Sequence, residues 1–222
     1  MKDNKRIIHV IGLNSFKFED LSKDVKDLFI KVKNIAAPET FLNDIKGWIS
    51  TEIIEDKKFF KSKSNIKLID WLKSIDNDVI LFSRGDPLWY GIGRILLTHF
   101  PSQELSFYPS KTCVQLAFSR LKKPWQDSIT VSIHGRNSTE LIKSLNLKEK
   151  SIAVLTDPKN NSLELIRENL KELNLENHYE FWLLEEVGFK NEKITLVCNN
   201  ENLPEEISKL NLVVLLKKES ND

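Results

Sequence analysis

Cysteine, methionine and glycine are scarce in this chain of 222 residues, which contains 2, 1 and 7 of them. The two cysteines, Cys113 and Cys198, are too far apart in sequence to indicate a disulfide framework or a metal-binding spacing. No window is both long and apolar enough to span a bilayer, and the first residues lack the pattern of a signal peptide. We therefore expect a soluble cytoplasmic protein with no metal site and no membrane contact.

An excess of positive charge is also missing, because 33 basic residues face 32 acidic ones and the net charge is +1. This balance leaves no basic stripe of the kind that binds nucleic acid, so we expect no nucleic-acid partner. Arginine occurs at only six positions, four of them between residues 84 and 136. Since its planar fork binds carboxylates in a way that lysine cannot, this distribution favours an acidic small-molecule ligand.

The first half of the chain alternates between apolar runs and segments with helical spacing, which is typical of α/β proteins with parallel strands. The predicted strands are 6–13, 35–37, 79–82 and 104–108, and the predicted helices are 21–32, 66–75 and 91–99. Residues 41–49 show no clear pattern. Pro109 and Ser110 form the best candidate boundary, which predicts two domains, 1–109 and 110–222.

The second half resumes the alternation and then changes. A helix is predicted at 112–121 and strands at 129–133 and 152–155, with capping pairs Asn137/Glu140 and Asn161/Glu164 at two later helices. Three more strand-like runs follow, at 179–184, 192–198 and 210–216. Because no full helix separates the first two of these runs, the second sheet is expected to be mixed, with antiparallel strands at its C-terminal end.

The run from Ser83 to Arg94 holds three of the seven glycines and two of the six arginines. It follows a predicted strand, so Gly85 lies where the backbone turns or approaches a ligand closely. Pro87 suits the first position of a helix. Ligands bind beyond the carboxyl ends of parallel strands, which makes this run a candidate binding site.

Four further turns carry polar or glycine residues after or between predicted strands, namely 12–15, 108–112, 133–136 and 155–158. Together with residues 83–94 they form an ordered set: "VIGL", "SRGDPLWYGIGR", "YPSKTCVQLAFSRLKKPWQD", "SIHGR", "LTDP" and "EEVG". This set resembles the tetrapyrrole methylase family, and "PWQD" followed by "SIHGR" resembles its precorrin-6Y or cobalt-precorrin-7 C(5)-methyltransferase branch. The resemblance extends over nearly the whole chain.

The resemblance implies two α/β domains with S-adenosylmethionine in a cleft between them, and a homodimer as the usual assembly. It assigns the cofactor to Ser15, Gly85, Asp86, Pro87, Trp89, Thr112, Cys113 and Thr156. It assigns the carboxylates of a precorrin or cobalt-precorrin substrate to His134 and Arg136, which match the branch's "HGR". Arg84, one of the clustered arginines, and Lys111, where the chain departs from the family pattern, are further candidates for these carboxylates, and His134 is also the candidate general base. In many relatives a second domain methylates carbon 15 and removes a carboxyl group, and we expect any such activity to reside in a separate polypeptide or in a further extension of this one.

Simpler structural interpretations stand beside these roles. Asp86 could cap the helix expected at Pro87, and His134 could bond only to backbone. Trp125 is expected to pack in a core, and Glu185 and Glu186 to face solvent. In the first loop, which lacks the family's second glycine, Asn14 could adopt a left-handed conformation instead.

Two other functions also remain open. One is a non-catalytic ligand-binding or scaffold subunit that kept the fold. The other is a methyltransferase of the same fold acting on a different substrate, such as RNA or a diphthamide precursor, which the lack of a basic stripe disfavours for RNA.

Overall fold

The structure is a computed structural model that describes residues 6–14, 17–48, 55–62, 64–148, 150–157, 161–198 and 202–218. The chain folds into two compact units, Met1–Thr112 and Cys113–Asp222. The division predicted from the sequence, after residue 109, lies three residues earlier.

Unit 1 is built on a five-stranded sheet in the order β3-β2-β4-β1-β5, and every pairing within it is parallel. Its strands are β1 (Ile8–Leu13), β2 (Asn34–Pro38), β3 (Lys58–Ser62), β4 (Val79–Arg84) and β5 (Leu105–Tyr108). Its α-helices are α1 (Lys23–Lys31), α2 (Glu39–Lys46), α4 (Asn65–Lys73) and α5 (Gly93–His99), and its short 3-10 helices are η1 (Phe18–Asp20) and η2 (Ser102–Glu104).

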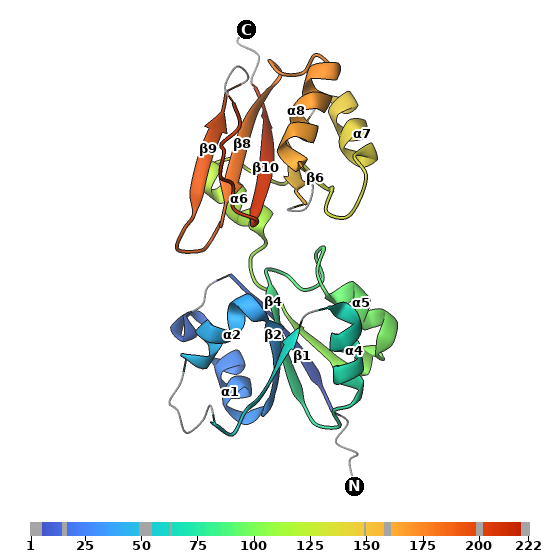
Figure 1. Ribbon diagram of the computed structural model, residues 1–222, viewed down its shortest axis with the longest axis vertical. Helices are drawn as coiled ribbons and strands as arrows, with labels where there is room; N and C mark the ends of the chain where they lie inside the picture. Colours follow the sequence, from blue (N-terminus) through green and yellow to red (C-terminus); the bar gives the residue numbers. More distant parts are fainter. Residues whose placement is uncertain are drawn as a thin grey trace. The chain divides into compact units, whose positions relative to one another are not determined.

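Helices cover both faces of this sheet, as Figure 1 shows for α1 and α2 on one side and α4 and α5 on the other. Alternate strand residues face opposite sides. On one face Ile11, Ile80 and Phe82 pack with Phe29 of α1 and Phe41 of α2. On the other face Val10, Leu81 and neighbouring strand residues pack with Leu68, Leu72 and Leu96 of α4 and α5. This two-sided burial explains the continuous apolar runs of β1 and β4.

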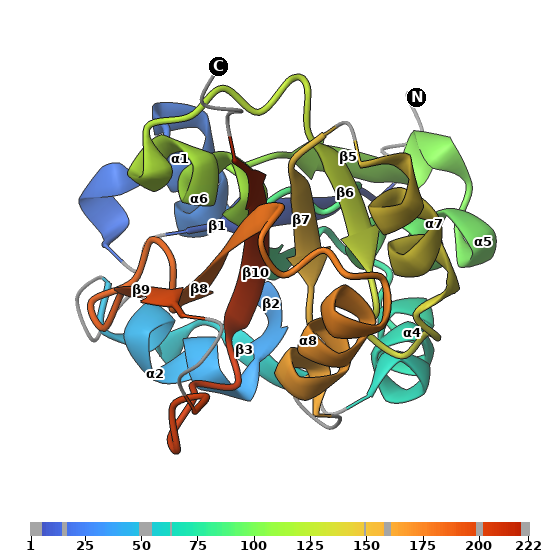
Figure 2. The same ribbon diagram turned by 90° about the horizontal axis from the view of Figure 1, so that it is seen from above.

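Unit 2 holds a second five-stranded sheet, in the order β6-β7-β10-β8-β9, whose strands follow one another from right to left in Figure 2. The strands are β6 (Ile129–Ser132), β7 (Ile152–Leu155), β8 (Tyr179–Glu185), β9 (Lys193–Val197) and β10 (Asn211–Lys217), and the helices are α6 (Cys113–Leu121), α7 (Thr139–Leu147) and α8 (Ser162–Glu172). Only β6 and β7 pair in parallel, while the other three pairings are antiparallel. The predicted mixed sheet is therefore confirmed.

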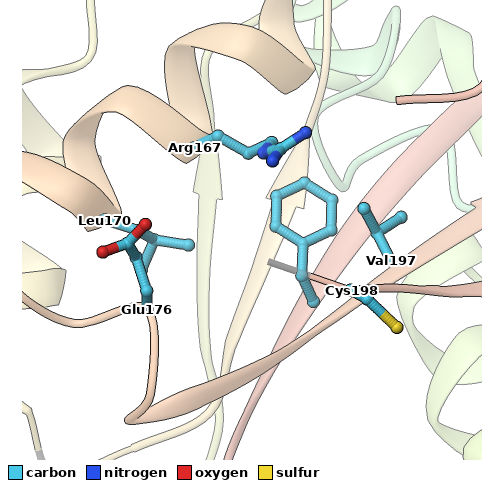
Figure 3. Close-up of a pocket in the computed structure, with 6 residues that line it drawn as sticks. Arg167, Leu170, Glu176, Val197 and Cys198 are labelled. Atoms are coloured by element: carbon cyan, nitrogen blue, oxygen red, sulfur yellow. The ribbon is translucent and has the colours of Figure 1, made fainter. Parts of the chain in front are cut away.

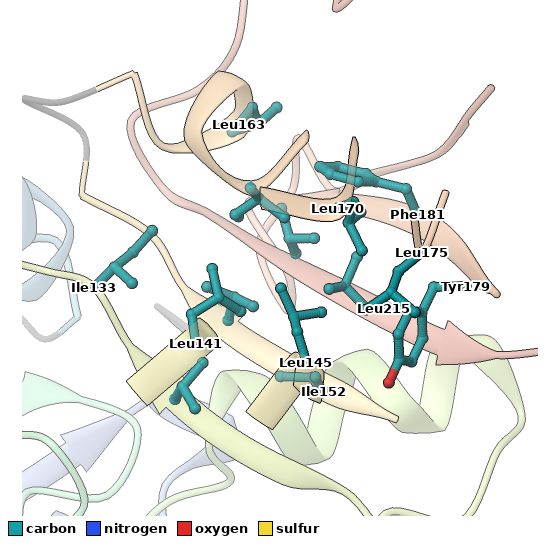
Figure 4. Packing of buried hydrophobic residues seen from close by; sticks show 14 of the residues in the cluster. Ile133, Leu141, Leu145, Ile152, Leu163, Leu170, Leu175, Tyr179, Phe181 and Leu215 are labelled. Atoms are coloured by element: carbon teal, nitrogen blue, oxygen red, sulfur yellow. The ribbon is translucent and has the colours of Figure 1, made fainter. Parts of the chain in front are cut away.

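The core of unit 2 lies between this sheet and α7 and α8. Figure 4 shows Leu141 and Leu145 of α7 and Leu170 of α8 pointing toward the strand residues Ile152 and Leu215. All of these side chains are less than 5% exposed. Figure 1 shows α6 on the other side of the sheet.

Local predictions failed where tertiary contacts outweighed sequence pattern. Residues 41–49 were left without a pattern, yet α2 occupies most of that segment, and its Phe41 and Ile45 are completely buried. Of the two predicted caps, one holds in part. Asn137 Oδ1 accepts a hydrogen bond from the nitrogen of Thr139, the first residue of α7, over 3.2 Å, although Ser138 is the N-cap residue. Asn161 lies at the N-cap of α8, but its side chain makes no cap hydrogen bond.

In the described part of the chain, no helix has the length and apolar character needed to cross a membrane.

Candidate functional site

The carboxyl ends of β1 and β4 form a switch point in the sheet of unit 1. These strands are neighbours, yet the chain leaves β1 toward α1 on one face and leaves β4 toward α5 on the other. In open α/β sheets such a divergence creates the crevice where ligands bind. The topology therefore selects the segments after Gly12 and Arg84 as the candidate site of this unit.

Backbone rather than side chains lines this point. A Cβ atom on Gly12 would lie 1.7 Å from the carbonyl oxygen of Gly85 and 3.0 Å from the nitrogen of Ser110. Gly85 has a φ of 57°, its nitrogen donates to the Leu13 oxygen over 2.9 Å, and its oxygen accepts from the Ser110 nitrogen over 3.2 Å. The loops after β1, β4 and β5 are thus held together, and Gly12 is required because the backbone of Gly85 and Ser110 fills the space that a side chain would need.

Asp86 and Pro87 form a turn. Asp86 Oδ1 accepts from the nitrogen of Leu88 over 2.8 Å, the Asp86 oxygen from Trp89 over 3.1 Å, and the Pro87 oxygen from Gly93 over 2.8 Å. The prediction that a helix begins at Pro87 is therefore wrong, since α5 begins only at Gly93. The helix-cap interpretation of Asp86 falls with it, because the carboxylate caps a turn outside the helix.

The other predicted residues of unit 1 surround these turns. The Arg84 guanidinium lies 5.1 Å from the ring centre of Phe41. Lys111 is exposed and Thr112 is buried, with the Lys111 oxygen accepting from Asn14 Nδ2 over 3.3 Å. Ser15 lies outside the described residues.

The left-handed conformation expected at Asn14 is wrong. In the described part of unit 1, positive φ values occur at Gly85 and Tyr90. Asn14 instead ties the first loop to the segment after β5 through its side-chain amide.

In unit 2, the "HGR" residues form one tight turn. The nitrogen of Arg136 donates to the oxygen of Ile133 over 3.2 Å, and Gly135 has a φ of 63°, which a turn of this kind requires at its third position. The Gly135 nitrogen donates to Asp157 Oδ2 over 2.9 Å, and His134 Nδ1 lies 3.2 Å from the Thr156 oxygen. The turn after β6 is thereby fastened to the end of β7, while His134 and Arg136 stay exposed.

The end of β7 is in turn bonded to the start of β10. Thr156 Oγ1 lies 2.7 Å from both the backbone oxygen and Oδ1 of Asn211, and Asn211 Nδ2 donates to the Ser208 oxygen over 2.7 Å. Glu185 Oε1 accepts from the Ser208 nitrogen over 2.8 Å, and Glu186 Oε1 accepts from Ser208 Oγ over 2.5 Å. A continuous set of hydrogen bonds thus runs along this edge of the sheet.

Two predictions about exposure in unit 2 were wrong. Glu185 is only 5% exposed, because its carboxylate is turned inward to bond the segment before β10. Trp125 is 49% exposed and does not belong to a core. The sequence interpretation also gave no role to Asp157 or Asn211. The "LTDP" motif hinted at Asp157, whereas nothing local marks Asn211, whose partner is 55 residues away.

Cys113 is the first residue of α6. Burial raises the pKa of its thiol to about 11. The raised pKa disfavours the thiolate near neutral pH, and the thiolate is the form that acts as a nucleophile.

A small hollow lies in unit 2 beside α8, near the start of β8 and the end of β9 (Figure 3). Its lining residues are Arg167, Leu170, Glu176, Phe181, Val197 and Cys198, and its volume is about 20 Å³. A space of this size suits about one water molecule and no cofactor. The described residues contain no group of three or more His, Cys, Asp or Glu side chains that could hold a metal ion.

Comparison with known proteins identifies the family. The sequence model of the tetrapyrrole (corrin/porphyrin) methylases matches residues 25–203. The chain belongs to the tetrapyrrole methylase family. The match confirms the resemblance carried by the motifs at 83–94, 133–136 and 155–158.

This tetrapyrrole methylase has curated relatives of modest identity. It is 27% identical over 151 residues to a probable cobalt-precorrin-7 C(5)-methyltransferase of Methanocaldococcus jannaschii, covering 65% of this chain and 69% of that protein. It is 29% identical over 103 residues to the cobalt-precorrin-7 C(5)-methyltransferase of Salmonella typhimurium, covering 46% of this chain and 49% of that protein. The second match thus spans about half of each chain.

Solved structures share the fold. The precorrin-6Y methylase of Archaeoglobus fulgidus aligns with a TM-score of 0.66 and 19% identity, covering 96% of this chain and 99% of that one. The uroporphyrin-III C-methyltransferase of Thermus thermophilus, solved with S-adenosylhomocysteine, aligns with a TM-score of 0.62 and 15% identity over 94% of this chain and 96% of that one. The predicted α/β class with a mixed second sheet is confirmed for this tetrapyrrole methylase.

Proposed function

We propose that the chain is an S-adenosylmethionine-dependent methyltransferase that methylates carbon 5 of a precorrin or cobalt-precorrin macrocycle. The observation that carries the proposal is the glycine-lined backbone where Gly12, Gly85 and Ser110 meet at the switch point of the first sheet. The names of the curated relatives supply the reaction and the substrate class.

The residues assigned to the cofactor suit its chemistry. S-adenosylmethionine supplies a methyl group on a cationic sulfonium. Gly85 turns the chain after β4 with a φ of 57°, and the Asp86 carboxylate, held by the Leu88 nitrogen, offers a negative charge to a cationic ligand. Pro87, Trp89, Thr112, Cys113, Thr156 and Ser15 complete the proposed cofactor set.

Positively charged side chains are proposed to bind the substrate. Arg84, Lys111, His134 and Arg136 are proposed to bind the acetate and propionate groups of the macrocycle, since guanidinium and carboxylate form paired hydrogen bonds. Methyl transfer is an in-line displacement at carbon, so aligning the two reactants contributes most, up to ~7 to 11 kcal/mol. His134 is the proposed base for the proton that the ring releases after methylation.

We also propose a homodimer and a separate polypeptide for any methylation at carbon 15. Light scattering of the purified chain distinguishes a dimer from a monomer. Product analysis by mass spectrometry shows one added methyl group and no loss of carbon dioxide if the second activity lies elsewhere.

Calorimetry with S-adenosylmethionine and S-adenosylhomocysteine tests whether the chain binds the cofactor. Binding of both supports the proposal, and the absence of heat and of a thermal shift at millimolar ligand overturns it in favour of a scaffold subunit.

Arg136→Lys is expected to raise KM for the macrocycle about tenfold, the loss of ~1.4 kcal/mol, with cofactor affinity unchanged. Arg94→Lys, on an exposed face of α5, serves as the matched control.

A further inference from the structure

We propose that Asn211 is a positioning residue that, through Thr156, holds His134 with its proton on Nδ1 and leaves Nε2 as the ring atom that meets the substrate. The inference deepens the proposed function, on which it rests for the presence of a substrate. Its geometry belongs to unit 2 alone.

The tautomer follows from the partner of the ring. His134 Nδ1 lies 3.2 Å from the backbone oxygen of Thr156. A carbonyl oxygen can only accept a hydrogen bond, so Nδ1 must carry the hydrogen. In the neutral ring Nε2 then has a lone pair and no hydrogen, and the exposed imidazole presents it outward.

Thr156 is fixed by Asn211. The Thr156 hydroxyl has one hydrogen, and both the backbone oxygen and Oδ1 of Asn211 lie 2.7 Å from it. The Asn211 amide cannot turn over without loss, because its nitrogen donates to the Ser208 oxygen over 2.7 Å. The Thr156 hydroxyl donates to one of two acceptors that both belong to Asn211, its backbone oxygen and Oδ1, and this residue thereby holds the end of β7 beside His134.

Two carboxylates hold Ser208, whose backbone oxygen accepts the hydrogen bond from the Asn211 amide. Asn211 is in register with the buried Glu185 on β8, and Ser208 is bonded through its nitrogen to Glu185 and through its hydroxyl to Glu186. Hydrogen bonds to carboxylates are stronger than those between neutral groups. The segment that carries Asn211 is thus held at two points, which is what a positioning residue needs.

The arrangement defines the proton transfer. When the substrate releases a proton after methylation, the C–H electron pair stays in the macrocycle and the proton bonds to Nε2. In the resulting imidazolium, Nδ1–H still donates its hydrogen bond to the Thr156 backbone oxygen. The Gly135 bond to Asp157 holds the backbone of the turn during this change.

Nitrogen-15 NMR of the histidine rings in the full-length chain without ligand tests the proposal. The chain has four histidines, and His134→Gln assigns the signal. The wild type is expected to show the Nδ1–H form of neutral His134. A dominant Nε2–H form, or equal amounts of both, would overturn the tautomer.

Variants test the positioning step. Thr156→Val removes the donor from both acceptors and is expected to lower the ratio of Nδ1–H to Nε2–H forms by about five- to tenfold, the effect of one hydrogen bond, whereas Thr156→Ser keeps the hydroxyl and the ratio. Asn211→Ala keeps the backbone acceptor and is expected to lower the ratio by less, about two- to threefold. Asn169→Ala is the control, because it removes another buried asparagine, on α8, whose amide bonds only its own helix. That variant is expected to lose stability with no change in the ratio.

An unchanged ratio in Asn211→Ala overturns the role of Asn211. If that variant does not fold, Thr156→Val compared with Thr156→Ser decides instead. These measurements need no cofactor, so failure of cofactor binding would remove the proposed function without touching them.

Discussion

The backbone nitrogen of Gly135 donates a hydrogen bond to the buried carboxylate of Asp157 over 2.9 Å. The two residues lie 22 positions apart, at the carboxyl ends of the adjacent parallel strands β6 and β7. This bond fastens the turn at residues 133–136, which carries the exposed His134 and Arg136, to the "LTDP" segment after β7.

Asp157→Ala is expected to lower the free energy of unfolding by about 1.5 to 3 kcal/mol, because it removes a buried charged acceptor from a backbone donor. Urea denaturation measures the change. Asp127→Ala, at an exposed turn position, is the control and should stay within ~0.5 kcal/mol of the wild type. Equal stability of the two variants would contradict the role given to Asp157.

Gly12→Ala is expected to destabilise unit 1 by about 3 kcal/mol or more, since its Cβ would meet the Gly85 oxygen at 1.7 Å and two backbone segments would have to separate. Gly47→Ala provides the contrast. Gly47 ends α2 with a φ of −81° and its new Cβ would come no closer than 3.4 Å to a described neighbour. That variant should be neutral or more stable by up to ~1 kcal/mol in thermal unfolding.

His9 is expected to make the fold sensitive to mild acid. The side chain is 8% exposed and its Nδ1 lies 3.1 Å from the Tyr108 hydroxyl. Burial lowers the pKa of His9, and the charge of Asp78 only partly offsets this. The unfolded chain therefore binds the proton more readily, so stability is lost as pH falls below ~6.5 toward the lowered pKa.

Thermal unfolding between pH 7.5 and 5 checks this expectation. His9→Gln should be less stable at pH 7.5 but should lose less on acidification than the wild type. His99→Gln, which alters an exposed histidine at the end of α5, should lose as much stability on acidification as the wild type. If His9→Gln also lost as much stability as the wild type, the acid sensitivity would arise elsewhere.

The two cysteines should differ in reactivity. Cys198 is exposed, whereas burial raises the pKa of Cys113 to about 11. Because the thiolate is the reactive form, Ellman's reagent at pH 8 should modify Cys198 rapidly and Cys113 at least ~100-fold more slowly. Cys198→Ser should leave only the slow phase, and a fast phase in that variant would contradict the burial of Cys113.

Residues whose role depends on near neighbours were predictable from the sequence. Gly85 was expected to adopt an unusual backbone conformation after a strand, and its φ of 57° agrees. Pro87 shows the limit, because the helix it was expected to begin starts six residues later. Between them the Pro87 oxygen accepts a hydrogen bond from the Gly93 nitrogen, a contact over six residues that the local sequence pattern did not predict.

The alternation of strands and helices, the turns at the scarce glycines and the family of the motifs could all be read from the amino-acid order. These properties depend on side-chain periodicity and backbone freedom, which act over a few residues. Tertiary structure alone decided the order of the strands, the contact of Gly12 with Gly85, the burial of Glu185 and the bond between Thr156 and Asn211. Each of these joins segments far apart in the chain, and strand pairing, which no single segment encodes, brings them together.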